Sequence, residues 1–94
     1  MEVFYTSKSQ KSILLIVKFV ESKNTKNSGK RFALKLESFI KKYAMEKVEY
    51  ALCYNEVLSS LGYSCIVFNN WVIAFKIKGN KFIVYRIIWG GLLL

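Results

Sequence analysis

The sequence contains no histidine, no aspartate and no proline, and only two cysteines. Without histidine, the chain cannot form Ser-His or Cys-His catalytic pairs, and it cannot use imidazole as a metal ligand or as an acid or base near neutral pH. Cys53 and Cys65 are too few for a four-cysteine zinc site and form no Cys-X-X-Cys motif. We therefore expect neither a metal nor a cofactor. Without proline, helices and strands can run uninterrupted.

Long apolar runs are also missing. The run ILLIV at 13–17 is followed by Lys18 and is far shorter than the roughly 18 apolar residues of a membrane helix. The first segment, MEVFYTSKSQ, lacks the charged and apolar regions of a signal peptide. We expect the two cysteines to be reduced and partly buried, as in a cytosolic protein. The sequence therefore predicts a cytoplasmic protein that does not associate with a membrane.

What the chain does have is apolar residues and positive charge. Its 94 residues, 53% of them hydrophobic, predict one globular domain spanning 1–94. Fifteen Lys and Arg face six acidic residues, which gives a net charge of +9. Such an excess favours contact with nucleic acid, an anionic membrane or an acidic protein. The alternative is that the charge only keeps a small apolar protein soluble.

The first half of the chain predicts a strand and a helix hairpin. Residues 2–5 are typical of a short strand, and Thr6 or Ser7 can cap a helix over 7–21. Asn24 or Thr25 is the expected cap of a second helix. Each helix has one apolar stripe, formed by Ile13, Ile16, Val17 and Val20 in the first and by Phe32, Leu36, Phe39, Ile40 and Tyr43 in the second. Residues 44–62 predict a short helix or irregular crossover that ends at Gly62.

The second half predicts a three-stranded antiparallel meander. Asn69-Asn70 and Gly79-Asn80 separate three runs rich in β-branched and aromatic residues, and both pairs suit two-residue hairpin turns. Such turns fix the register, so Phe68 should face Trp71 and Lys78 should face Lys81. The sequence therefore predicts an α+β fold in which an N-terminal strand and a two-helix hairpin precede the sheet, with the hairpin packed on one face of it.

Strict alternation along these strands sorts their side chains into two faces. The face covered by the helices should carry Ile66, Phe68, Trp71, Ile73, Phe75, Ile77, Phe82, Val84 and Ile88. The opposite face should carry Tyr63, Cys65, Val67, Val72, Ala74, Lys76, Lys78, Lys81, Ile83, Tyr85, Ile87 and Trp89. Lysines directly opposite each other repel, which is mildly destabilising. Their roles are either protection of a sheet edge or binding of an anionic partner beside stacking aromatics.

Arg86 does not fit this alternation, because it would point into the apolar face, where an unpaired guanidinium is very costly. A β-bulge could re-aim it, it could reach out from the sheet margin, or it could pair with Glu2. We include it among the candidate binding residues, near Trp89. The terminal leucines 92–94 either pack under the helices or form an apolar patch for another chain.

The order of strand, helix hairpin, crossover and meander resembles the RelE/ParE toxin superfamily of toxin–antitoxin systems. The helix hairpin of that family, in which an "NT" or "NP" pair separates the two helices, is similar to SILLIVKFVESKNTKNSGKRFALKLESFI. Its terminal β-hairpin is similar to WVIAFKIKGNKFIVYRIIWGG. The resemblance implies a toxin, connected with plasmid stabilization, that a cognate antitoxin neutralises. It also implies one of two targets: DNA gyrase for ParE-like members, or ribosome-bound mRNA, which RelE-like members cleave.

The chain departs from the nuclease branch at three places. Trp89 stands where many relatives have His, the apolar Val72 stands where nuclease members have Arg, and a late basic segment ending in Tyr is missing. Lysines and Arg86 could stabilise charge on a phosphate, but only tyrosines or a lysine could transfer a proton. The first interpretation is therefore a ParE-like toxin that binds its target, with an mRNA endonuclease and a non-toxic basic binding module as alternatives. The expected binding residues are Lys76, Lys78, Lys81, Tyr63, Tyr85, Arg86 and Trp89.

Overall fold

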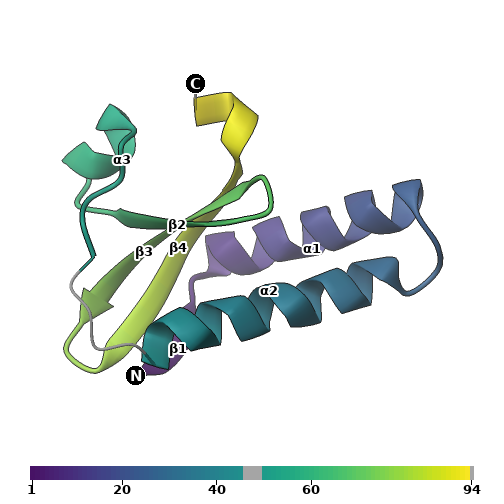
Figure 1. Ribbon diagram of the computed structural model, residues 1–94, viewed down its shortest axis with the longest axis horizontal. Helices are drawn as coiled ribbons and strands as arrows, with labels where there is room; N and C mark the ends of the chain where they lie inside the picture. The colour runs from purple at the N-terminus through teal and green to yellow at the C-terminus, as the bar shows by residue number, and fades with distance from the viewer. Residues whose placement is uncertain (46–49, 94) are drawn as a thin grey trace.

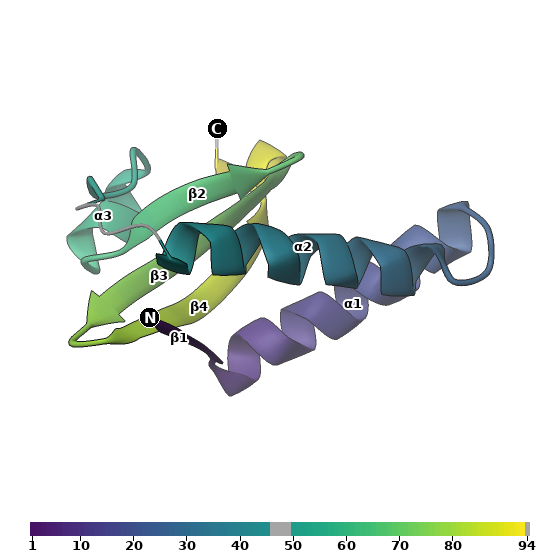
Figure 2. The ribbon, with the colours of Figure 1, turned by 60° about the horizontal axis from the view of Figure 1, so that its bottom comes forward.

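The computed structural model describes residues 1–45 and 50–93 and has the predicted α+β class. Figures 1 and 2 show the two long helices side by side against the sheet, and the short third helix apart from them beside the start of β2. The elements in chain order are β1 (Glu2–Tyr5), α1 (Ser7–Lys23), α2 (Ser28–Met45), α3 (Glu56–Ser60), β2 (Ser64–Phe68), β3 (Trp71–Lys78), β4 (Lys81–Trp89) and a final 3₁₀ turn, η1 (Gly90–Leu93).

The two long helices form the expected hairpin. Thr6 caps α1, because its hydroxyl accepts a hydrogen bond from the Ser9 backbone N–H. Asn24, one of the two expected caps of the second helix, instead ends α1, and α2 begins at Ser28. The apolar stripes face the sheet as predicted: Ile16, Leu36 and Ile40 are buried in the main core.

Gly29 lies where the two helices approach most tightly. A Cβ atom at this position would stand 2.5 Å from the carbonyl oxygen of Val17 and 2.7 Å from Cγ of Glu21. Because a backbone oxygen cannot move aside without shifting α1, we expect Gly29→Ala to lower the free energy of unfolding by about 1–2 kcal/mol, despite the higher helix propensity of alanine. Chemical denaturation measures this change. The exposed neighbour provides a control: Lys30→Ala should change stability by less than about 0.5 kcal/mol, and equal effects at both positions would contradict the close-approach argument.

The sheet has four strands rather than the predicted three. Its order is β1-β4-β3-β2, and the N-terminal strand joins it by pairing in parallel with β4, from Glu2 beside Lys81 to Tyr5 beside Val84. The two hairpins have the predicted register, with Phe68 opposite Trp71 and Lys78 opposite Lys81. The first residue of each turn has a positive φ, 54° at Asn69 and 59° at Gly79. Asparagine and glycine tolerate this conformation better than other residues, which explains why the register could be predicted.

A β-bulge changes the predicted faces in the second half of β4. Phe75 pairs with Val84 and Ala74 pairs with Arg86, so Tyr85 is an extra residue between them. The bulge shifts the alternation by one position. Arg86 therefore does not point into the helix-covered face, Ile87 moves into the main core, and Ile88 packs with the cluster on the opposite face. The predicted faces of Ile87, Ile88 and Trp89 were wrong for this reason.

The main core lies between the helix hairpin and one face of the sheet. Its centre is the pair Phe75 and Phe82, whose rings are stacked with centroids 4.3 Å apart and which are both fully buried. The opposite face is partly covered by α3, which buries Ala74 under Leu58 and Cys53. Of the terminal leucines, Leu92 is 77% exposed and does not pack under the helices, and Leu94 lies outside the described residues.

Candidate functional site

Five of the seven predicted binding residues lie on one face of the sheet, opposite the helix hairpin. Lys76 and Lys78 come from β3, Lys81 and Tyr85 from β4, and Tyr63 directly precedes β2. We call these five residues the lysine–tyrosine face. The rings of Tyr63 and Tyr85 are 5.3 Å apart, and Lys76 Nζ lies 5.0 Å from the first ring and 5.7 Å from the second. Lys78 Nζ is 5.9 Å from the Tyr85 ring.

The β-bulge helps to form this cluster. The extra residue at Tyr85 places its ring against Tyr63 while Val84, on one side, and Ile87, on the other, remain in the main core. Bulges often re-aim a side chain at a functional site. Lys81 points away from the two tyrosines, and its Nζ lies 5.3 Å from the ring of Phe4 in β1. The face therefore extends from the short α3 side to the β1 edge of the sheet.

The lysine–tyrosine face carries positive charge without compensation. Among the described residues, none of its three lysines forms an ion pair with a carboxylate. Lys78 and Lys81 are exposed and directly opposite each other, so their charges repel. Contact of an ammonium group with an aromatic ring contributes only about 0.5–1 kcal/mol at exposed sites, which offsets part of this repulsion. The arrangement suits an anionic partner, whose phosphate or carboxylate groups would relieve the repulsion.

Arg86 and Trp89 make none of these contacts, although the bulge pairs Arg86 with Ala74, on the side of the sheet that carries the lysine–tyrosine face. Arg86 is partly buried and lines a groove between α1 and the end of β4, together with Lys8. Glu2, its proposed partner, lies instead beside Lys81. Trp89 points to the face that carries the helices, where its ring lies 5.2 Å from that of Trp71. Trp89 was assigned to the lysine face because strict alternation does not foresee the bulge, whereas Arg86 was included only as an anion contact near Trp89.

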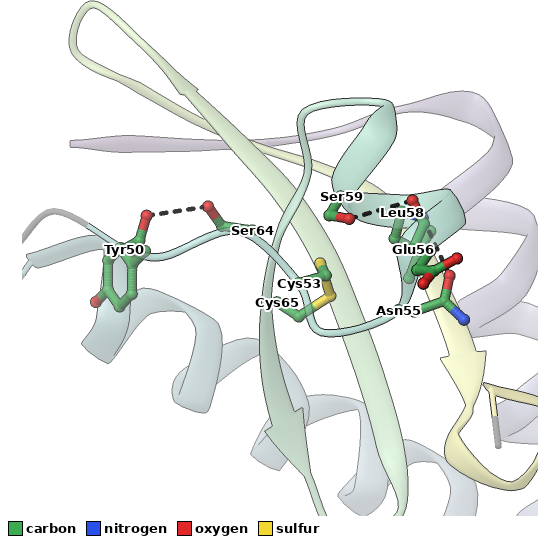
Figure 3. Close-up of a disulfide and its surroundings, with 8 residues drawn as sticks. All are labelled: Tyr50, Cys53, Asn55, Glu56, Leu58, Ser59, Ser64 and Cys65. Atoms are coloured by element: carbon green, nitrogen blue, oxygen red, sulfur yellow. Dashed lines mark hydrogen bonds between the residues drawn. A yellow bond between two sulfur atoms is a disulfide. The ribbon is translucent and has the colours of Figure 1, made fainter.

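A disulfide fixes the segment that borders the lysine–tyrosine face. Figure 3 shows the bond between Cys53 and Cys65, so the expectation of reduced cysteines was wrong. The Cys53 backbone N–H also donates to the carbonyl of Tyr63, at 2.9 Å. The Asn55 side chain caps α3 by accepting from the Leu58 N–H, at 3.1 Å. The covalent bond and these hydrogen bonds together hold α3 over Ala74 and position the backbone of Tyr63.

Outside the lysine–tyrosine face, the described part of the chain offers few groups for metal binding or proton transfer. No group of three or more His, Cys, Asp or Glu side chains there could hold a metal ion. Burial, with a smaller contribution from Glu37, raises the pKa of Tyr5 to about 12, but this tyrosine lies under α2 and not on the lysine–tyrosine face. None of the described helices is both long enough and apolar enough to cross a membrane.

The five residues of the lysine–tyrosine face can bind anions and stack planar groups, and none of them is a carboxylate or an imidazole; Glu2 lies beside Lys81 at the β1 edge without forming an ion pair with it. Tyrosine hydroxyls and lysine ammonium groups are the only groups of these five residues able to transfer a proton. Neither models of known protein families nor curated proteins give a match to the sequence.

Proposed function

We propose that the protein is a growth-inhibiting toxin of the RelE/ParE kind that binds an essential target through the lysine–tyrosine face. The observation that carries the proposal is the position of Lys76 over the adjacent rings of Tyr63 and Tyr85, on a cationic face whose lysines form no ion pair among the described residues. Such a face recognises phosphate or carboxylate groups by charge and planar groups by stacking. The order of one strand, a helix hairpin and a meander supports the same family.

Binding without hydrolysis is the first form of this proposal. Efficient RNA cleavage needs a group that removes the 2′-OH proton and another that protonates the leaving oxygen. The chain has no histidine, and none of the five residues of the face is a carboxylate that could perform these steps. DNA gyrase, a protein that acts on DNA, is therefore the proposed target, an acidic antitoxin is the proposed neutralising partner, and the proposed compartment is the cytoplasm.

A second candidate function is cleavage of mRNA on the ribosome. It is favoured by the proximity of Lys76 to two tyrosine rings, since an ammonium group could stabilise charge on a phosphate while a tyrosine hydroxyl transfers a proton. Cut messages and an arrest of translation after induction would favour this candidate. Induction of the DNA-damage response and loss of supercoiling would favour gyrase.

Growth on induction of the chain tests the proposal. We expect expression alone to stop growth, co-expression of a neighbouring short acidic reading frame to restore it, and Lys76→Ala/Lys78→Ala/Lys81→Ala to abolish the inhibition. If the target site includes nucleic acid, its affinity should fall as the salt concentration rises. Each lost phosphate contact should reduce the magnitude of the slope of log affinity against log salt concentration by about 1, so the triple variant should reduce it by about 3.

The control removes the same charge elsewhere. Lys26, Lys30 and Lys35 are exposed on the helix hairpin and are not part of the lysine–tyrosine face, and their triple alanine variant should still inhibit growth. Growth unaffected by the wild-type chain at a verified expression level would contradict the toxin proposal and favour a non-toxic basic binding module. Inhibition that survives the Lys76/Lys78/Lys81 variant would remove the role given to this face.

A further inference from the structure

A second surface feature lies at the edge of β4 that β1 leaves open, and it shares no residue with the lysine–tyrosine face. It is a groove of about 470 Å³ between α1 and the C-terminal half of β4. Its apolar lining includes Leu15, Ile16 and Phe19 from α1, Ile87 and Trp89 from β4, and Leu92 from η1. We call it the α1–β4 groove. Arg86 and Trp89, two of the predicted binding residues, line it, and so does Leu92 of the apolar patch considered for the terminal leucines.

The groove exists because β1 is shorter than β4. The parallel pairing ends at Tyr5 beside Val84, so residues 85–89 of β4 have no strand on that side, and α1 passes there instead. Ile16 and Ile87 are buried and form the floor, whereas the rims are open. Phe19 is 55% exposed, Leu15 67% and Leu92 77%. Contiguous exposed apolar side chains with a buried apolar floor mark a surface that a partner covers.

The charges at the groove indicate the chemistry of that partner. Thr6 Oγ1 donates to the carbonyl of Tyr85, which fixes the beginning of α1 beside the beginning of the unpaired β4 segment. Lys8 and Arg86 therefore lie at the same end of the groove, and the residues that line it include no carboxylate. The other end, with Phe19, Trp89 and Leu92, is apolar. A second copy of this chain would bring further positive charge, because the chain carries +9.

We infer that the α1–β4 groove binds an acidic amphipathic segment of another protein. Large apolar side chains of the segment would cover Leu15, Phe19 and Trp89, and its Asp or Glu residues would face Lys8 and Arg86. The α1 residues that line the groove run from Lys8 to Phe19, which is about 16 Å along a helix axis and accommodates about three helical turns of a partner. The inference does not depend on toxicity and uses a surface distinct from the lysine–tyrosine face.

Selection from a random peptide library tests the inference and assumes no particular partner sequence. The full chain is immobilised, and displayed 16-residue peptides are selected on it. We expect the selected peptides to combine Leu, Ile or Phe with an excess of Asp and Glu. A synthetic copy of one selected peptide, labelled with a fluorophore, should then lose about 30-fold or more in affinity for Leu15→Glu/Phe19→Glu, as expected when central apolar contacts are removed.

Two further variants make the test specific. Leu34→Glu introduces one glutamate at a leucine of α2 that is 55% exposed and outside the groove, and it should bind the peptide as the wild type does. Lys8→Glu should weaken the peptide about tenfold, and a peptide with Lys in place of its Asp and Glu should recover that loss. Circular dichroism checks that each variant is folded.

Several results would overturn the inference. Selected peptides without an acidic excess, or with affinities that Leu15→Glu/Phe19→Glu does not change, would show that the groove is not an acidic-segment site. A concentration-dependent dimer that this variant abolishes would assign the groove to a second copy. Binding to vesicles containing phosphatidylserine that the variant abolishes, with no peptide selected, would assign it to an anionic lipid surface.

Discussion

Replacing Phe82 with alanine is expected to lower the free energy of unfolding by roughly 3–5 kcal/mol. Phe82 is fully buried, stacks on Phe75 and pairs across the strands with Ile77. The substitution removes most of a side chain from the centre of the main core, where helices and sheet leave no room to collapse, and so adds a cavity to the lost burial. A domain of this size has a total stability of only roughly 5–14 kcal/mol, so the variant should be close to unfolding at 37 °C.

Denaturation by urea, followed by circular dichroism, measures this effect by linear extrapolation. Phe4→Ala is the matched control, because Phe4 is also a strand phenylalanine but is 40% exposed at the sheet edge. It should cost less than about 1 kcal/mol. Similar losses at the two positions would show that the Phe75–Phe82 pair is not the centre of the core.

The sequence predicted the parts of the fold that depend on local patterns. The helix stripes around Ile16 and Leu36 follow from apolar spacing, and both hairpin registers follow from two-residue turns. From these registers alone, Lys76, Lys78 and Lys81 could be placed together on one face. Tyr63 and Tyr85 were assigned to the same face, and their ring contact agrees with that assignment.

What the sequence did not predict depends on long-range or irregular structure. The parallel pairing of Glu2–Tyr5 with β4 joins segments about eighty residues apart, and no local pattern encodes it. The bulge at Tyr85 adds one residue within a run of apolar and aromatic side chains. A prediction that alternates strictly along the strand therefore assigns the residues after Tyr85 to the wrong face of the sheet. The difficulty with Arg86 was the one signal of this bulge, since a strand without it would bury an unpaired charge.

The disulfide was missed for a different reason. Two cysteines in a chain with no further cysteine pattern are equally compatible with free thiols, and it is the antiparallel bridge between Leu52 and Ser64 that places Cys53 beside Cys65. The bond also bears on the expected compartment. Because stable disulfides are rare in the cytosol, the cysteines no longer support a cytoplasmic location.

Replacing both cysteines, as Cys53→Ala/Cys65→Ala, is expected to lower the free energy of unfolding by about 3 kcal/mol, because the bond closes a loop with a sequence separation of 12 and restricts the unfolded chain. The helix it secures has only five residues, too few to be stable without tertiary contacts, so α3 should detach and expose Ala74. Urea denaturation with and without dithiothreitol measures the effect: reduction should lower the stability of the wild type to nearly that of the variant and leave the variant unchanged.

Because the Cys53 N–H holds the Tyr63 carbonyl, the loss of the disulfide should also loosen the contact between the Tyr63 ring and Lys76. A wild type equally stable in both conditions would contradict the role of this bond in supporting the lysine–tyrosine face.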